Sequence, residues 1–243
     1  MNLADGGTLA FLNLAEQHAL LLSALTSIAV AIVCLPPGVA VAWLLARRQF
    51  FGKTLLDTAV HLPLVLPPVV VGYALLTLLG REGVIGGALH AIGIDVAFTP
   101  AAIVIAGAVM AFPLLVRSAR LAFEAVDPAL EDAARTLGKS ASATWWRVTL
   151  PLAAPGIAGG TLLCFARALG EFGATMTFAG NIEGTTRTVP LLIFTELQSP
   201  GGELRIGRLV AISVVIAMVA LFLSERGARR WRHQHSARSN GGA

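Results

Sequence analysis

Five long stretches of this chain contain no Asp, Glu, Lys or Arg, and this pattern restricts its possible folds more than any other feature. The charge-free windows span residues 17–46, 58–80, 96–116, 148–166 and 209–224. A helix needs about 20 apolar residues to cross a bilayer core of about 30 Å, and four windows meet that length. The fifth meets it if residues 206–207 extend it and Arg205 and Arg208 reach to the interface. Because backbone groups inside a bilayer must be satisfied internally, the windows predict five transmembrane helices.

The overall composition agrees with a membrane protein. Charged residues make up 13% of the chain and hydrophobic residues 56%, whereas soluble domains average about 25% charged residues. This composition argues against a soluble globular protein, a disordered chain and a nucleic-acid-binding domain. We therefore expect an all-α integral membrane protein that binds membrane lipid and no nucleic acid.

The positions of the basic residues predict how the chain is oriented. If the chain crosses five times, 13 of its 18 Lys and Arg residues fall on one side, which the positive-inside rule assigns to the cytoplasm. Residues 1–16 contain no Lys or Arg, so we expect the N-terminus outside and the C-terminus in the cytoplasm. The predicted organisation is an outer segment over 1–17, a transmembrane domain over 18–226 and a basic cytoplasmic tail over 227–243.

Several predicted helices contain helix-breaking residues. Pro36 and Pro37 interrupt the first window. In the second window, Pro63, Pro67 and Pro68 fall within a stretch of six residues. Broken backbone at membrane depth is tolerated where it is buried in protein or lines a wet cavity, and transporters use it to build a pathway. The cluster over 63–68 is therefore interpreted either as part of a pathway or as a kink without a passage. In the fourth window, the GxxxG spacing of residues 156–160 favours close helix contact.

Two further features lie beyond the fourth window. Arg167 and Glu171 are one helical turn apart in an apolar stretch, and they form either a functional site at membrane depth or an ion pair near the outer interface. The apolar piece over 189–194 is too short to span. It predicts a short re-entrant or interfacial helix on the outer side, which counts as a sixth membrane helix if it enters the bilayer.

The loop over 117–149 is the longest polar segment between predicted helices. Asp127 can cap a helix that starts at Pro128, and Gly138 can end it. A second short helix is expected from Ser140 or Ser142 into the membrane. The loop therefore predicts a compact two-helix projection on the cytoplasmic side, with the neighbouring tryptophans at 145 and 146 at headgroup level.

The chain shows no convincing site for a nucleotide or a metal. Residues 133–140 resemble a phosphate-binding loop without its first glycine, but no strand is expected before them. The five histidines show no metal-ligand spacing with Cys34 and Cys164, which are interpreted as packing residues. We expect no cofactor on this chain, no catalytic residues and no enzymatic activity.

The same loop resembles the EAA loop of ABC-importer permeases. That pattern is Glu-Ala-Ala, three residues, Gly, nine residues and Ile-x-Leu-Pro, and here Asp132-Ala133-Ala134, Gly138 and residues 148–151 keep its spacing. Asp replaces Glu and Val replaces Ile. The stretches 61–73, 133–138, 170–175, 186–190 and 198–203 further resemble the molybdate permease subunits of type I ABC importers. Sulfate permeases share the stretch around 170–173.

This resemblance implies a permease of an ATP-driven importer that moves molybdate by alternating access across the bacterial inner membrane. It implies a homodimer, two cytoplasmic ATPase subunits that bind ATP and Mg, and a periplasmic molybdate-binding protein. The implied ATPase-coupling loop over 124–149 includes Glu131, Asp132, Ala133, Ala134, Arg135, Gly138, Leu150 and Pro151. The implied pathway or gate includes Pro63, Pro67, Pro68, Arg167, Gly170, Glu171, Gly173 and Thr175. The alternatives are a sulfate or tungstate permease, a passive anion channel and a membrane-bound enzyme.

Overall fold

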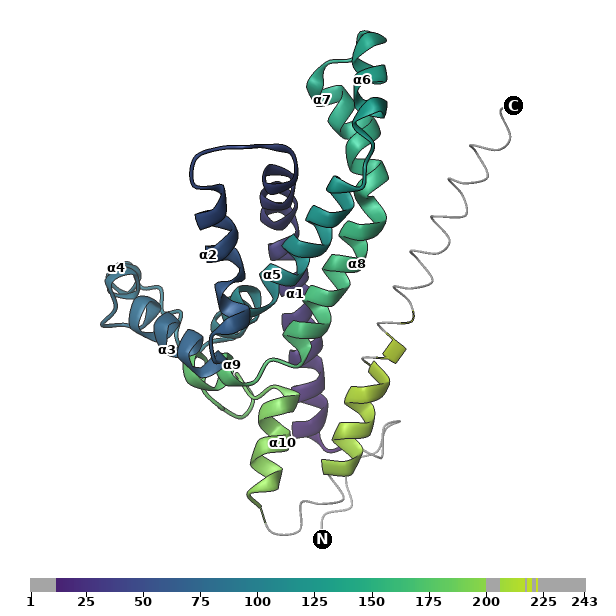
Figure 1. Ribbon diagram of the computed structural model, residues 1–243. Helices are drawn as coiled ribbons and strands as arrows, with labels where there is room; N and C mark the ends of the chain where they lie inside the picture. The colour runs from purple at the N-terminus through teal and green to yellow at the C-terminus, as the bar shows by residue number, and fades with distance from the viewer. Residues whose placement is uncertain (1–11, 200–205, 217, 220–221, 223–243) are drawn as a thin grey trace.

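The computed structural model describes residues 12–199, 206–216, 218–219 and 222, and every regular element among them is helical (Figure 1). This confirms the all-α prediction. The basic tail over 227–243 and most of the predicted N-terminal segment lie outside the described residues, as does most of the stretch over 198–203.

Three long helices pack together as the centre of the molecule. They are α1 (Leu14–Arg47), α5 (Pro100–Glu124) and α8 (Leu150–Leu169), the last continuous with a short lead-in from Ala141. Each is long and apolar enough to cross a membrane, which confirms the first, third and fourth windows as helices. Their shared core is built from small and branched aliphatic side chains together with one phenylalanine, and it includes Ala42, Leu45, Val116, Ala119, Phe123 and Ile157.

The expected interruption at Pro36 and Pro37 does not occur. Both prolines lie inside α1, which runs for 34 residues without a break. A proline removes one backbone N–H donor but its fixed φ is compatible with a helix. The carbonyls that lose their donors belong to Ile32 and Val33. The loss of hydrogen bonds is therefore confined to one turn, and the helix continues on both sides of it.

The second window is broken. It covers most of α2 (Lys53–Val65) and all of α3 (Pro68–Leu79), and the axes of these two helices differ by 114°. Leu66 and Pro67 have extended backbone between the two helices. Pro68 takes the first position of α3, where a missing N–H costs least. The described residues therefore contain three membrane-length helices, or four if the bent pair counts as one span.

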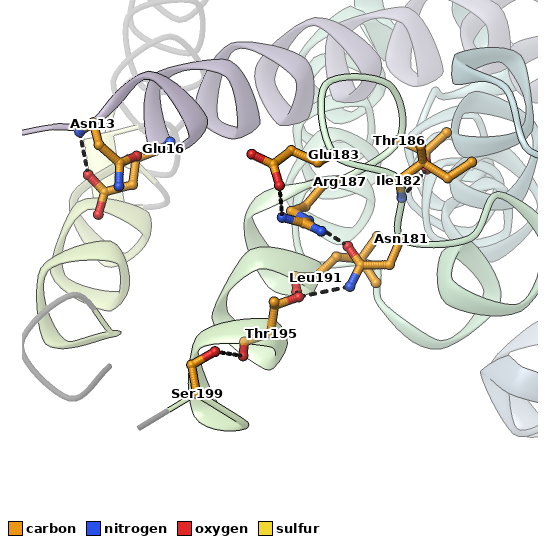
Figure 2. Close-up of polar contacts among 10 residues, drawn as sticks. All are labelled: Asn13, Glu16, Asn181, Ile182, Glu183, Thr186, Arg187, Leu191, Thr195 and Ser199. Atoms are coloured by element: carbon orange, nitrogen blue, oxygen red, sulfur yellow. Dashed lines mark hydrogen bonds and ion pairs between the residues drawn. The ribbon is translucent and has the colours of Figure 1, made fainter. Parts of the chain in front are cut away.

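The fifth window appears in the structure as a helix over Ile206–Ile216. Arg208, expected to reach to the membrane interface, is turned toward α1 and forms an ion pair with the buried Glu16. Glu16 also completes a capping box with Asn13 at the start of α1, with both hydrogen bonds at 2.8 Å (Figure 2). The pair fixes the start of the last helix against the start of the first.

Five short segments connect the long helices. They are α4 (Val84–Ala91), α6 (Pro128–Thr136), α7 (Ala141–Thr144) with the π-helix η1 (Trp145–Thr149), α9 (Gly173–Phe178) and α10 (Val189–Leu197). The loop helices α6 and α7 lie at one end of the molecule and α10 at the opposite end (Figure 1). With nine residues, α10 is the short helix that the apolar piece over 189–194 predicted.

Candidate functional site

The loop between α5 and α8 folds as its cap residues predict. The Asp127 carboxylate accepts a hydrogen bond from the Ala129 N–H at 2.9 Å and starts α6. Gly138 follows the end of α6 with φ +81°, a left-handed conformation that glycine adopts without strain. The Ser140 hydroxyl caps α7 through the Ala143 N–H at 3.2 Å. The two short helices thus form a projection beyond the long helices (Figure 1).

The predicted coupling residues in this projection divide into two groups. The Asp132 side chain is 73% exposed, Ala133, Arg135 and Gly138 are exposed with it, and Ala134 is half-buried. Leu137, which was not among the predicted residues, is 82% exposed beside them. The Glu131 side chain is only 16% exposed and is turned toward the long helices. The outward group is available to a partner, and Glu131 is already engaged within the chain.

The connection from the projection to α8 is a π-helix. Residues Trp145–Thr149 take π geometry between α7 and α8, so the chain turns from the loop into α8 without a break. Such single-turn π segments occur often at functional sites. Leu150 and Pro151 are the first two residues of α8 and are partly buried. Pro151 takes a position where its missing N–H is tolerated.

The break between α2 and α3 meets the segment after α8. A Cβ atom added to Gly173 would lie 2.9 Å from the Pro68 Cβ, and one added to Gly72 would lie 2.7 Å from the Ala174 carbonyl oxygen. Only glycine permits so close a crossing of α3 and α9. The structure therefore brings the predicted gate residues Pro68 and Gly173 together, and Pro67 precedes Pro68 as the N-cap of α3.

The acidic residue at the end of α8 organises this crossing. Glu171 is buried, forms an ion pair with Arg167, and accepts a hydrogen bond from the Ala174 N–H at 2.9 Å. The ion pair is present, and it is compatible with both interpretations of these two residues. Gly170 ends α8 just before it. Thr175, on α9, is buried, and its hydroxyl has no hydrogen-bond partner among the described residues.

One predicted pathway residue lies apart from the others. Pro63 is inside α2 and lines a pocket of about 450 Å³ together with Pro37, Cys34 and Phe112. Cys34 and Cys164 are buried and free, as expected of packing residues. The eight pathway residues are therefore placed at the α3–α9 crossing, at the end of α8 and, for Pro63, on α2.

The segment between α9 and α10 is held by a polar network at the end opposite to the projection (Figure 2). The Arg187 guanidinium donates to Asn181 Oδ1 at 3.0 Å and to the Glu183 carboxylate at 2.9 Å. The Asn181 amide donates to the Thr195 hydroxyl of α10 at 2.8 Å. The Val189 N–H at the start of α10 donates to the Ser23 hydroxyl of α1. Arg187 thus orders the loop from both of its ends.

A second polar group was not predicted from the sequence. Arg81 donates two hydrogen bonds to the Asp95 carboxylate, and His90 lies 2.9 Å from it. The hydrogen bond from Arg81 lowers the pKa of Asp95 below its usual value, and His90 adds to the effect. The group borders a pocket of about 910 Å³ between α3, α4 and the start of α5. Fourteen residues separate Arg81 and Asp95 in sequence, and only the turn through α4 brings them together.

The helical architecture, with three helices of membrane length and the broken α2–α3 pair, is that of a membrane protein with several spans. The family described as binding-protein-dependent transport system inner membrane component matches residues 38–231, and the chain belongs to this family.

Individual relatives agree with this assignment. The chain is 54% identical over 215 residues to the molybdenum transport system permease protein ModB of Escherichia coli, covering 88% of this chain and 94% of ModB. It is 36% identical over 196 residues to the sulfate transport system permease protein CysW of Synechocystis sp., covering 81% of this chain and 71% of CysW. Its fold is similar to that of a bacterial alginate ABC transporter solved with a substrate-bound periplasmic protein. That match has a TM-score of 0.70 and 19% identity and covers 90% of this chain and 80% of the other.

Proposed function

We propose that this chain is the permease subunit of an ATP-driven importer that carries molybdate across the bacterial inner membrane. The observation that carries the proposal is the 54% identity to a molybdenum permease over nearly the full length of both chains. Sulfate is the second candidate, because a sulfate permease is also a relative, but its identity is 36%. Molybdate, tungstate and sulfate are tetrahedral dianions, so selection among them depends on small differences in size and hydrogen bonding.

The assembly consists of two copies of this chain, two cytoplasmic ATPase subunits and a periplasmic binding protein. The outward group on α6 docks to an ATPase, which binds ATP and Mg. A short capped helix ended by a glycine is a rigid contact of this kind. Exposed apolar side chains along α1 and α3, among them Ile32, Val33 and Val69, would face lipid or the second copy.

The orientation follows from where the basic residues gather. The Arg47–Glu131 ion pair joins the end of α1 to the projection, and the Arg120–Asp57 ion pair, at 2.8 Å, joins the last part of α5 to the first part of α2. These four parts of the chain therefore lie at the same end of the molecule. The positive-inside rule assigns this end to the cytoplasm. The network around Arg187 then faces the periplasm, with the N-terminus outside.

The α3–α9 crossing is the proposed gate. Atoms this closely packed do not deform gradually, so the crossing favours a change between two discrete arrangements. Arg167 and Glu171 hold α9 in place from the end of α8. An anion that passes here would meet the Arg167 guanidinium, whose positive charge is largely balanced by Glu171. A balanced charge attracts an anion only weakly, so it favours passage over tight binding.

Competition for uptake tests the substrate. Purified permease and ATPase subunits are reconstituted in vesicles with the cognate binding protein and labelled molybdate. We expect uptake to require ATP, to fall when tungstate is added at equal concentration, and to persist with sulfate at equal concentration. Equal competition by sulfate would show that the importer does not discriminate between the two anions and would overturn the assignment to molybdate. Uptake without ATP would indicate a passive channel instead.

A further inference from the structure

Neighbouring carboxylates on α6 point in different directions. Asp132, which takes the acidic position of the loop motif, is mostly exposed, whereas Glu131 is mostly buried. Glu131 lies at the fourth position of α6, one turn from the Asp127 cap. A helix turns by about 100° per residue, so the side chains of adjacent residues project from different faces. The two carboxylates therefore serve different contacts.

The Glu131 contact joins three segments of the chain. Glu131 Oε1 accepts a hydrogen bond from the Arg47 guanidinium at 3.0 Å and another from the Thr149 hydroxyl at 2.9 Å. Arg47 is the last residue of α1, and Thr149 is the last residue of η1, directly before α8. The same Arg47 nitrogen donates to the Val126 carbonyl before α6 at 2.9 Å. We call Arg47, Glu131 and Thr149 the Glu131 clamp.

The clamp is shielded from water. The Arg47 and Glu131 side chains are 18% and 16% exposed, and Thr149 is buried. When one partner of such a shielded ion pair is removed, the folded protein is strongly destabilised, because the remaining charge is left without compensation. The contact is therefore stiffer than the exposed pair between Arg135 and Asp132, whose atoms are 4.0 Å apart.

We infer that Glu131 is a positioning residue that transmits movement of α6 to α1 and α8. The inference rests on the proposed function, in which an ATPase moves the exposed face of α6. Without the clamp, α6 remains attached through the α5–α6 connection and the turn at Gly138, and can tilt without moving the ends of α1 and α8. With the clamp, both long helices follow α6, and the π-helix that ends at Thr149 is the segment through which α8 responds. Glu131 itself makes no contact with the ATPase.

The test measures coupling separately from docking. The permease carrying Glu131→Ala is assembled with its ATPase, and two quantities are recorded: co-purification of the ATPase, and molybdate imported per ATP hydrolysed. We expect unchanged co-purification and an import ratio that falls about tenfold, within the range by which changes along a coupling route act. Thr149→Val removes only the hydroxyl contact and should lower the ratio by about threefold. Glu183→Ala is the matched control, because Glu183 is an exposed carboxylate outside the coupling loop whose ion-pair partner, Arg187, is four residues away; its ratio should stay unchanged.

Two outcomes overturn the inference. An unchanged import ratio in the Glu131→Ala variant means that the clamp transmits nothing, and loss of ATPase co-purification means that Glu131 is a docking contact. If the Glu131→Ala variant fails to insert into the membrane, the Thr149→Val variant decides instead. An unchanged ratio of molybdate imported per ATP hydrolysed in that variant also overturns the inference. Failure of the proposed function is distinct, because the wild-type protein would then show no ATP-dependent molybdate uptake.

Discussion

A single glycine determines how the projecting loop turns after α6. Gly138 has φ +81°, and a Cβ atom added there would meet nothing within 4 Å. Within the chain, a substitution therefore acts through the backbone and clashes with no side chain. The Gly138 N–H also donates to the Arg135 carbonyl at 2.9 Å, which proline cannot do.

We predict a graded loss of transport at this position. Gly138→Asn should retain most uptake, since asparagine tolerates the left-handed region, whereas Gly138→Ala should cost about 1 kcal/mol of loop stability and lower uptake. Gly138→Pro should abolish coupled uptake while the protein remains inserted. ATP-dependent molybdate uptake and the amount of inserted protein measure the series.

Gly93 provides the control for general strain. It has φ +82° and equally open surroundings, but it lies after α4, far along the chain from the loop. Gly93→Ala carries the same backbone cost and should leave uptake near the wild-type level. Equal losses in Gly93→Ala and Gly138→Ala would contradict a specific role for the loop.

Two glycines allow α5 and α8 to approach closely, as their spacing predicted. A Cβ atom on Gly156 would overlap the Ala122 Cβ, and one on Gly160 would lie 2.8 Å from the Ser118 Cβ. The Ser118 hydroxyl donates to the Gly156 carbonyl at 2.9 Å and holds the pair together. Gly159 lies on the same helix, but nothing lies within 4 Å of its Cβ position.

Substitution of these glycines should therefore have opposite outcomes. Gly156→Ala forces α5 and α8 apart and should destabilise the protein by about 1–3 kcal/mol, as overpacking does. Gly159→Ala adds the same methyl group to α8 without a clash and should raise stability by about 0.5–1 kcal/mol, because alanine is a better helix former than glycine. Thermal unfolding of the purified protein in detergent measures both, and equal melting temperatures for the two variants would contradict the close α5–α8 contact.

The sequence predicted the helices better than it predicted their contacts. Charge-free windows located α1, α5 and α8, and the cap residues Asp127, Gly138 and Ser140 located α6 and α7, because these signals are local. The 114° bend between α2 and α3 was not predicted, since a proline cluster specifies a break but not its angle. The inward direction of the Glu131 side chain also depends on Arg47, which lies 84 residues away. From the sequence, Arg47 was interpreted only as one of the basic residues that set the orientation of the chain.

Across the complete chain, the crossing count depends on the bent α2–α3 pair. If the pair spans the membrane, the connection between α3 and α4 lies opposite to the projection, and the five-crossing topology holds. If the pair re-enters, that connection lies on the same side as the projection, and α5, whose start is tied to the connection by the Arg81–Asp95 ion pair, does not cross either, so the count falls by two. Ser140 in the projection, Glu82 before α4 and Glu183 after α9 are three exposed positions that report these alternatives.

Accessibility of introduced cysteines decides between them. The two native cysteines are free and buried, and replacing both with alanine gives a background in which a membrane-impermeant maleimide labels only the introduced thiol. We expect Glu82→Cys and Glu183→Cys to be labelled in intact spheroplasts, and Ser140→Cys only after the membrane is opened, because the basic residues near Ser140 hold that end in the cytoplasm. Labelling of Glu82→Cys only in opened membranes would make α2–α3 a re-entrant pair, and labelling of Ser140→Cys in intact spheroplasts would reverse the orientation of the permease.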